Sequence, residues 1–169
     1  MPEINEYGQT VGDALPDWHG ASVLQRTVLE GRWCRLEPLD PERHAADLFD
    51  AYAQADDERD WTWLASRRPD SVAATFHWLS GKANDDALVP FTVVDIRAER
   101  AVGLVCFMAI EREHGSVEIG HVTWSPRMKN SVLGTEAVWL LLRYAFAQGY
   151  RRVEWKCRTC RSPARGALS

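Results

Sequence analysis

The sequence predicts a mixed α/β (α+β) fold, in which an antiparallel run of strands leads into a β-α-β unit. Residues 91–97, 101–111 and 116–124 contain many β-branched residues and are separated by short turns, a pattern typical of an antiparallel meander. A strongly apolar helix is expected at 134–148, and an alternating strand follows at 151–157. A strand, a helix and a strand in this order favour a right-handed crossover. We therefore expect the last two strands to be parallel, in a mixed sheet with helices on both faces.

The chain divides into an N-terminal arm at 1–26, a domain at 27–157 and a basic tail at 158–169. The arm lacks clear periodicity, and Trp18 is a candidate to pin it to the domain. The domain opens with an expected strand at 32–39, which alternates in polarity after a Glu-Gly turn signal.

Two helices are predicted after this strand. Asp40 and Pro41 form a helix start, with aspartate as the N-cap and proline at the first helical position. Apolar residues then recur at helical spacing to about Gln54, and they are Ala45, Leu48, Ala51 and Tyr52. A second helix is expected from about 70 to 79. Together with the segments above, this gives the element order β-α-α-β-β-β-α-β.

Composition excludes several classes of protein. With 169 residues, 46% hydrophobic and 26% charged, the chain has the size and composition of a single globular domain. No apolar run approaches the roughly 20 residues that span a membrane, and the N-terminus lacks the features of a secretory signal. We therefore expect a cytoplasmic protein with reduced cysteines and no membrane partner. A net charge of −4 argues against a general nucleic-acid binder.

The segment from 117 to 146 offers a candidate anion site. A strand runs into a polar loop, and a helix is expected to begin near Gly134, Thr135 and Glu136. Free backbone N–H groups at a helix N-terminus bind phosphate readily, and Arg127 and Lys129 add positive charge. Any strand, loop and helix offers such an N-terminus, so this signal alone is weak.

The residues here carry a resemblance to a known family. VEIGHVTWSP and GTEAVWLLLRYAF resemble the central strand and helix of the GNAT N-acetyltransferase superfamily. GRWCRLEPLDPERHAADLFDAY is similar to the opening strand and helix of its ribosomal-protein-acetyltransferase-like branch, and RRVEWKC resembles the next strand. The resemblance covers about 30–157 and implies a GNAT-like sheet whose parallel strands splay apart.

The resemblance implies acetyl-CoA as the acyl donor, and we expect no metal. It implies that the pantetheine arm lies along Val122, Thr123 and Trp124. The family's pyrophosphate loop has the pattern Gln/Arg-x-x-Gly-x-Gly/Ala and leads into the helix at Thr135. On this sequence the pattern falls on Lys129, Asn130, Ser131, Val132, Leu133 and Gly134. Lys129 is a mild departure from the pattern, whereas Val132 replaces a glycine, restricts φ and is expected to weaken binding.

The same resemblance points to catalytic candidates. Transfer to an amine needs a group that takes up the amine proton, and Glu118 lies mid-strand where relatives often have a glutamate. The alternative for Glu118 is a carboxylate on the face of the strand, paired with a basic neighbour. His121 is the rival base, but strand alternation points it to the opposite face, where it would be a buried core histidine. Trp61 and Trp63 fall where relatives shape the acceptor pocket, and core packing is their alternative role.

The C-terminal residues depart from the resemblance. Relatives continue with a further helix and strands, whereas the chain from residue 158 reads RTCRSPARGALS, with no acidic or aromatic residue. A truncated or frameshifted chain is one hypothesis, and a genuine short variant is the other. The strand at 151–157 would then have an open edge, which predicts low solubility or a homodimer through that edge. Cys157 and Cys160 form a CxxC without further ligands nearby, so we treat the motif as incidental.

These observations leave three functional hypotheses. The first is an N-acetyltransferase acting on a small amine or a protein N-terminus. The second is a GNAT-like domain that binds CoA or a protein partner without turnover. The third is an interaction protein whose basic C-terminal end contacts nucleic acid or acidic partners, which the overall negative charge disfavours.

Overall fold

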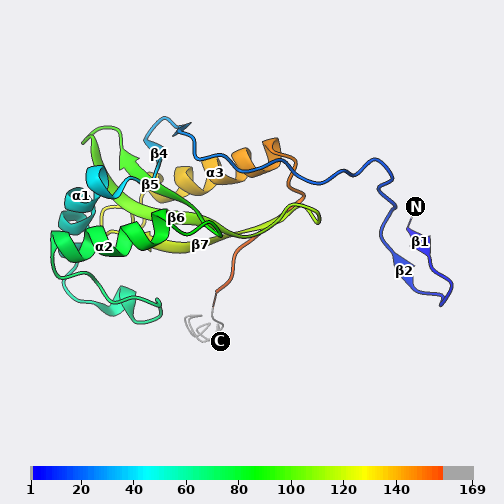
Figure 1. Ribbon diagram of the computed structural model, residues 1–169, viewed down its shortest axis with the longest axis horizontal. Coiled ribbons are helices and arrows are strands. Elements are labelled where there is room, and N and C mark those ends of the chain that lie inside the picture. The colour runs from blue at the N-terminus through cyan, green and yellow to red at the C-terminus, as the bar shows by residue number, and fades with distance from the viewer. Residues whose placement is uncertain (1, 158–169) are drawn as a thin grey trace, which may run out of the picture.

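The computed structural model describes residues 2–157 and contains one mixed sheet covered by helices on both faces (Figure 1). The sheet has six strands in the order β3-β4-β5-β6-β7-β8. The strands are β3 (Leu29–Glu30), β4 (Cys34–Pro38), β5 (Val89–Asp95), β6 (Arg100–Glu111), β7 (Ser116–Trp124) and β8 (Arg152–Glu154). Neighbouring strands are antiparallel except β7 and β8, which are parallel. The predicted fold class is confirmed.

Two apolar clusters fill the space on either side of the sheet. Helices α1 (Pro41–Ala53) and α2 (Val72–Ala83) share one cluster, in which Leu48 and Leu79 pack with Leu104 of β6. Helix α3 (Val132–Ala147) packs on the other face. Strand β5 is buried along its whole length. This central position agrees with its run of apolar and β-branched residues.

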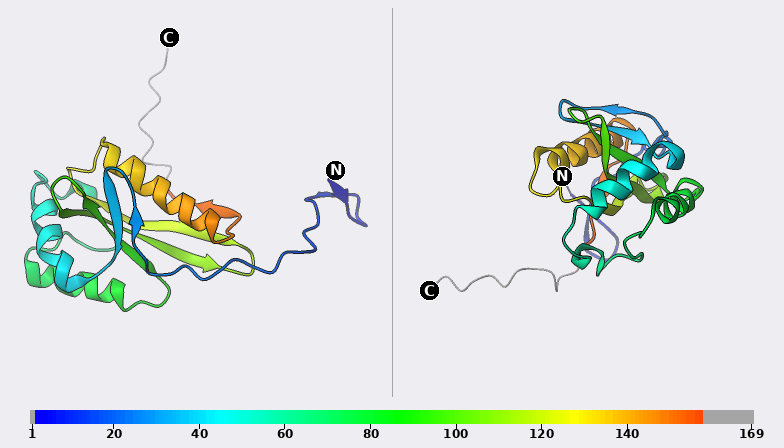
Figure 2. Two further views of the ribbon diagram at one scale, coloured as in Figure 1. Left: turned by 90° about the horizontal axis from the view of Figure 1, so that it is seen from above. Right: turned by 90° about the vertical axis from the view of Figure 1, so that its left-hand side faces the viewer.

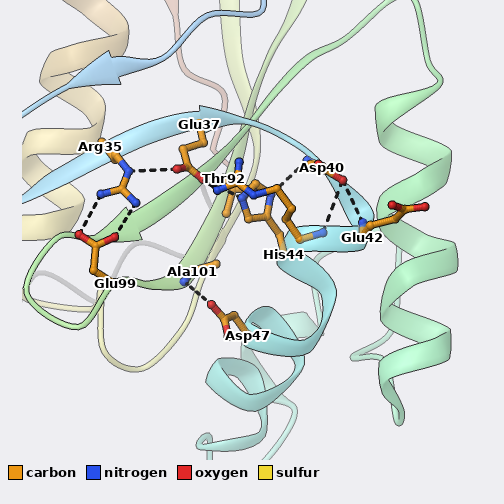
Figure 3. A network of polar contacts seen from close by, with 10 residues as sticks. Arg35, Glu37, Asp40, Glu42, His44, Asp47, Thr92, Glu99 and Ala101 are labelled. Atoms are coloured by element: carbon orange, nitrogen blue, oxygen red, sulfur yellow. Dashed lines mark hydrogen bonds and ion pairs between the residues drawn. The ribbon is translucent and has the colours of Figure 1, made fainter.

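The start of α1 agrees with the prediction and is tied to the sheet (Figure 3). The Asp40 side chain accepts hydrogen bonds from the backbone N–H groups of Glu42 and Arg43, with proline at the first position. His44, one turn later, is buried. Its Nε2 lies 2.8 Å from a Glu37 carboxylate oxygen, and its Nδ1 lies 3.0 Å from the Thr92 hydroxyl. These contacts satisfy polar groups that would otherwise be costly to bury.

The other helices differ from their expected limits. Helix α2 begins at Val72 behind the Ser71 N-cap and ends at Ala83, later than expected, because nothing before Asn84 disrupts it. Helix α3 begins two residues earlier than expected, because Ser131 rather than a later residue caps it. Gly149 has a φ of 88° just after α3, which matches its expected role in ending the helix.

The last strand is shorter than predicted. Residues 151–157 alternate in polarity, but only Arg152–Glu154 form a strand, and they pair with β7. Among residues 2–157, β8 is the edge strand of the sheet on this side. Dimerisation through this edge stays a prediction.

The arm crosses the domain and then leaves it (Figures 1 and 2). Trp18 anchors it, as expected: its indole N–H donates to the Glu113 carbonyl at 2.7 Å. A β-carbon at Gly115 would meet this indole at 2.6 Å, so the close approach requires glycine. Beyond Trp18, the arm ends in a small hairpin of β1 (Glu3–Ile4) and β2 (Thr10–Val11).

Candidate active site

A cleft opens where β7 and β8 diverge. The two strands pair only from Ser116 to Glu118 on β7, whereas β7 continues to Trp124. A cavity of about 530 Å³ lies at this divergence, lined by the free part of β7, by the loop around Trp61 and by residues 155–157. The splayed arrangement expected from the resemblance is therefore present.

A β-bulge shapes the middle of β7. Leu104 of β6 pairs with Thr123 and Cys106 pairs with Gly120, so Val105 faces two residues instead of one. His121 provides the extra residue and adopts a left-handed conformation with φ 51°. A bulge of this kind bends a strand and redirects its side chains.

Glu118 lies at the inner end of the cleft. It is buried, and its Oε2 lies 2.6 Å from Lys156 Nζ. That oxygen has no hydrogen-bond partner of good geometry among residues 2–157. The close Glu118 carboxylate raises the pKa of Lys156. Glu118 therefore combines both sequence-based interpretations, since it lines the cleft and also pairs with a basic neighbour.

The predicted orientation of His121 is wrong. Val117 and Ile119 belong to the cluster beneath α3, which places Glu118 on the opposite face. Simple alternation would return His121 to the α3 face, but the bulge turns it to the face of Glu118. There it lines the same cavity, and its Nδ1 lies 2.5 Å from Lys82 Nζ on α2.

Electrostatics keep His121 uncharged at neutral pH. Burial, and then the neighbouring Lys82, lower the pKa of His121 from its usual value of 6.5. Burial also lowers the pKa of Lys82. A neutral imidazole that accepts a hydrogen bond at Nδ1 carries its own hydrogen on Nε2. His121 is therefore a half-buried polar group of the cleft and not the core histidine that alternation predicts.

Trp61 and Trp63 line the same cavity in different ways. Trp61, in the 3-10 helix η1 (Arg59–Trp61), is buried and packs edge-on against Tyr52, with ring centroids 5.3 Å apart. Trp63 is 47% exposed, so it offers an aromatic surface at the mouth of the cleft. Trp61 therefore serves both the core and the cleft, whereas Trp63 belongs mainly to the cleft.

The end of β7 connects this cavity to α3. Val122, Thr123 and Trp124 line the cavity, as expected for the strand end. The Thr123 carbonyl accepts a hydrogen bond from the buried Tyr52 hydroxyl at 2.9 Å. Trp124 also lines a second cavity, of about 540 Å³, at the start of α3. The two cavities thus adjoin along one continuous surface.

The second cavity holds most of the predicted pyrophosphate loop. Its lining residues, besides Trp124 and Met128, are Lys129, Asn130, Ser131, Val132, Gly134 and Thr135. Leu133 differs, because its side chain is buried in the core beneath α3. The backbone N–H of Leu133 already donates to the Ser131 hydroxyl at 3.3 Å. Leu133 therefore anchors the helix start and does not line the cavity.

Val132 causes no backbone strain in this loop. It is the first residue of α3, and among residues 125–135 only Asn130, with φ 52°, has a left-handed backbone. Asparagine tolerates that region better than most residues. The expected φ restriction at Val132 therefore does not distort the start of the helix.

Three charged residues in or next to the cleft were not predicted from the sequence. Asp60 forms an ion pair with Lys129 across the cleft, Lys156 pairs with Glu118, and Lys82 reaches His121. Each comes from a different element and is 38 to 69 positions away from its partner in the chain. Alternation on 151–157 could have suggested Lys156, but no local pattern indicates the other two.

The described residues offer no metal site and no membrane span. Residues 2–157 contain no cluster of three potential metal ligands. None of the helices in this part of the chain is long and apolar enough to cross a membrane. Cys157 is exposed at the cleft, and Cys160 lies outside the described residues.

Comparisons with known proteins agree with this architecture. A family model described as an acetyltransferase (GNAT) domain matches residues 34–167. A GCN5-related N-acetyltransferase from Brucella melitensis is 34% identical, with a TM-score of 0.84 over 88% of this chain and 68% of that chain. A probable GNAT-family acetyltransferase from Chromobacterium violaceum is 32% identical, with a TM-score of 0.80 over 95% of this chain and 78% of that one.

More distant comparisons support the fold alone. A ribosomal L7/L12 α-N-protein acetyltransferase is 17% identical, with a TM-score of 0.62 over 79% of this chain and 72% of that chain. A search of curated proteins gives no match. The ribosomal-protein branch therefore stays a prediction.

The fold, the splayed cleft and the helix start next to it define an acyltransferase domain. The chain belongs to the GNAT acetyltransferase family. The family match includes most of residues 158–169, whose conformation lies outside the described residues. The truncation hypothesis is not confirmed.

Proposed function

We propose that this protein is a cytoplasmic, acetyl-CoA-dependent N-acetyltransferase that acetylates a primary amine. The observation that carries the proposal is the continuous surface from Glu118, along Val122 to Trp124, to the N-terminus of α3. Family membership supports acyl transfer in general. A small molecule or a protein N-terminus would provide the amine, and no nucleic acid or membrane takes part.

The residues at the start of α3 fit a nucleotide pyrophosphate. The N-terminus of a 16-residue helix meets an open cavity there, and its unpaired N–H groups and dipole favour an anion. Lys129 adds a positive charge, which Asp60 now balances. We expect Lys129 to exchange Asp60 for phosphate oxygens. Val122, Thr123 and Trp124 would then line the path of the pantetheine arm.

Glu118 is our candidate to take up the amine proton. Bound acetyl-CoA would supply a thioester: the C–N bond would form as the C–S bond breaks, and CoA would leave as a thiolate that takes up a proton to give the free thiol. The attacking amine must be neutral, so a carboxylate that accepts its proton speeds the reaction. Glu118 is buried at the inner end of the cleft, and its ion pair with Lys156 holds it in place.

The cleft mouth suits an amine carried on an apolar or flat group. The exposed Trp63 offers an aromatic face there, the buried Trp61 lines the same cavity, and Asp60 provides a carboxylate next to Trp61. An aromatic face and a carboxylate both attract a cation. An amine would therefore arrive in its charged form and lose its proton inside the cleft.

Binding without turnover is the alternative function; turnover by the wild type separates the two, and one substitution tests the role of Glu118. Glu118→Gln keeps the shape of the side chain and removes its basicity. We expect kcat for thiol release from acetyl-CoA, with a panel of polyamines and short peptides, to fall by about 100-fold or more. Acetyl-CoA affinity should stay within about threefold of the wild-type value.

Glu154→Gln is the matched control. Glu154 is the β8 partner of Glu118 and pairs with Arg152, but it does not line the cleft. Its substitution should leave kcat unchanged. Wild-type acetyl-CoA binding without release of thiol above the uncatalysed rate, for any amine, would favour the alternative function. Full activity of Glu118→Gln would remove Glu118 from the chemistry.

A further inference from the structure

The hairpin of the N-terminal arm exposes apolar residues that its own domain does not cover. Ile4 is 72% exposed and Tyr7 78%, and Leu15, between the hairpin and Trp18, is 50% exposed. The hairpin extends away from the body of the molecule (Figures 1 and 2). The hydrogen bonds of Asn5, Tyr7 and Gln9 join these residues to one another. A two-stranded hairpin of this size is marginal in water on its own, so it needs a surface to stabilise it.

The outward face of α3 is such a surface. Trp139 and Phe146, seven positions apart, lie on one side of the helix and are 51% and 53% exposed. Arg143 lies between them, with its guanidinium 5.3 Å from the centre of the Trp139 ring. We call Trp139, Arg143 and Phe146 the α3 stripe. The core-facing residues of α3 lie on the opposite side of the helix, so the stripe has no role in the core.

The charges of the two surfaces are complementary. Residues 2–17 contain Glu3, Glu6, Asp13 and Asp17 but no lysine or arginine. Helix α3 contains a single carboxylate, Glu136, which is turned to the β3–β4 turn and hydrogen-bonded there. The α3 stripe therefore offers apolar surface and a positive charge to an acidic, apolar arm.

The path of the arm points to a second molecule. The Ser22 N–H donates to the Gln148 carbonyl at 2.8 Å and the Gln25 N–H to the Tyr144 hydroxyl at 2.7 Å, so the arm passes the C-terminal end of α3. Its last anchor is Trp18 at the turn between β6 and β7. Beyond Trp18 it continues away from its own helix (Figure 1). Residues 2–17 span up to about 50 Å when extended, and a helix the length of α3 is about 24 Å long. The arm is therefore long enough to lie along a neighbouring α3.

We propose that two copies of this chain form a dimer by exchanging N-terminal arms. Each arm docks its hairpin on the α3 stripe of the other copy. A two-fold axis beside the C-terminal ends of the two helices makes both contacts equivalent, as a closed symmetric dimer requires. This dimer differs from one formed through the edge of β8, because it leaves that edge and the cleft open.

The first test is the mass of the full chain in solution, measured by light scattering and sedimentation. We expect twice the chain mass of 19.2 kDa. Deletion of residues 2–15, or Trp139→Glu, should raise the dimer dissociation constant at least about tenfold, because an interface loses its aromatic anchor or its arm. Phe76→Glu is the matched control, since Phe76 is a 41% exposed aromatic residue on α2, and it should leave the dimer intact.

Mixing the two disrupted chains gives a sharper test. The arm-deleted chain keeps its stripe, and the Trp139→Glu chain keeps its arm. Neither chain can form an intact arm–stripe contact in its own homodimer. In the heterodimer, the arm of the Trp139→Glu chain can dock on the stripe of the arm-deleted chain, which gives one intact contact. We therefore expect a heterodimer of the mixture that is tighter than either homodimer.

Three results would overturn the proposal. A monomeric wild-type chain at about 100 μM would exclude the dimer, as would an arm deletion that leaves its dissociation constant unchanged. A mixture whose heterodimer is no tighter than either homodimer would show that arm and stripe do not meet between copies. Circular dichroism spectra of all variants would establish that each is folded. None of these outcomes depends on acetyltransferase activity.

Discussion

His121 shows how one residue can change what a strand presents. The left-handed backbone at this position is uncommon for any residue other than glycine, although histidine and asparagine adopt it more readily than most. It turns the imidazole into the cleft beside Glu118 and Lys82. Non-glycine residues held in sparsely populated conformations are often found at functional sites, and His121 agrees with that pattern.

The pH dependence of activity should report on His121. Burial and Lys82 hold its pKa below 6.5, so the imidazole is neutral at pH 7 and becomes charged as pH falls through that lowered pKa. A charged imidazole would repel Lys82 and an incoming cationic amine. We expect kcat/KM to fall at pH values below 6.5.

The matched variant is His121→Asn, which tolerates the same backbone conformation and does not titrate. In kcat/KM profiles measured from pH 4.5 to 8, we expect the acid limb to weaken or move to lower pH. The same limb in both proteins would assign it to another group and contradict this account of His121.

Predictions for single residues were correct where the structure depends on adjacent residues in the chain. They were wrong where it depends on how two strands pair. Asp40, Pro41 and Gly149 act at helix ends as predicted, because capping depends on a few adjacent residues. His121 was misplaced because period-two alternation assumes an unbroken ladder. The bulge that breaks the ladder depends on how β6 pairs with β7, which the sequence of one strand does not reveal.

At the scale of elements, α3 links the cleft to the opposite part of the sheet. The Glu136 carboxylate accepts hydrogen bonds from the backbone N–H groups of Arg32, Trp33 and Cys34, at 2.7 to 2.8 Å. The turn between β3 and β4 is thereby fixed to α3 near the start of the helix. The sequence predicted this helix. It did not predict the short strand β3 or the hydrogen bonds that Glu136 accepts beside it, because these bonds join residues about 100 positions apart.

Glu136→Gln should destabilise the protein. An amide has a single acceptor oxygen, so at least one of the three backbone donors would lose a charge-assisted partner. We expect the free energy of unfolding to fall by about 2 kcal/mol, measured by urea denaturation at pH 7. Asp86→Asn, a substitution of an exposed loop carboxylate, is the control and should change stability by less than about 0.5 kcal/mol.

The contribution of Glu136 should also depend on pH. Burial alone would raise its pKa, but the three backbone hydrogen bonds outweigh burial and hold the pKa below its usual value of 4.5. A carboxyl group with a lowered pKa stabilises the fold above its unfolded-state pKa, and this stabilisation is lost as pH falls through the folded value. The difference between wild type and Glu136→Gln should therefore shrink below pH 4.5, and a difference that is constant from pH 7 to pH 3 would contradict this.

At the scale of the whole molecule, the order of the strands creates the site. The only parallel pair described is β7–β8, and it separates after three residues, which leaves the end of β7 free to line a cleft that leads to α3. The sequence predicted this topology from one strand-helix-strand unit. It did not predict the charged partners Asp60, Lys82 and Lys156, since each reaches the cleft from a different part of the fold.

In the proposed function, this cleft and the start of α3 hold acetyl-CoA. Gly134 provides the comparison, because a β-carbon there makes only ordinary contacts, with Met128 O at 3.4 Å and Trp124 Nε1 at 3.6 Å. Gly134→Ala is the size control. Gly134→Glu adds a carboxylate at the third helical position, where it stabilises the helix but repels a pyrophosphate.

The most direct measurement is the melting temperature with and without acetyl-CoA at about 100 times its dissociation constant. We expect the wild type and Gly134→Ala to gain about 2.7 kcal/mol, a rise of about 5–11 °C for a domain of this size. Gly134→Glu should melt cooperatively, at least as high as the wild type without ligand, and gain little. A folded wild-type protein with no rise at millimolar acetyl-CoA, or an equal rise in Gly134→Glu, would contradict the account.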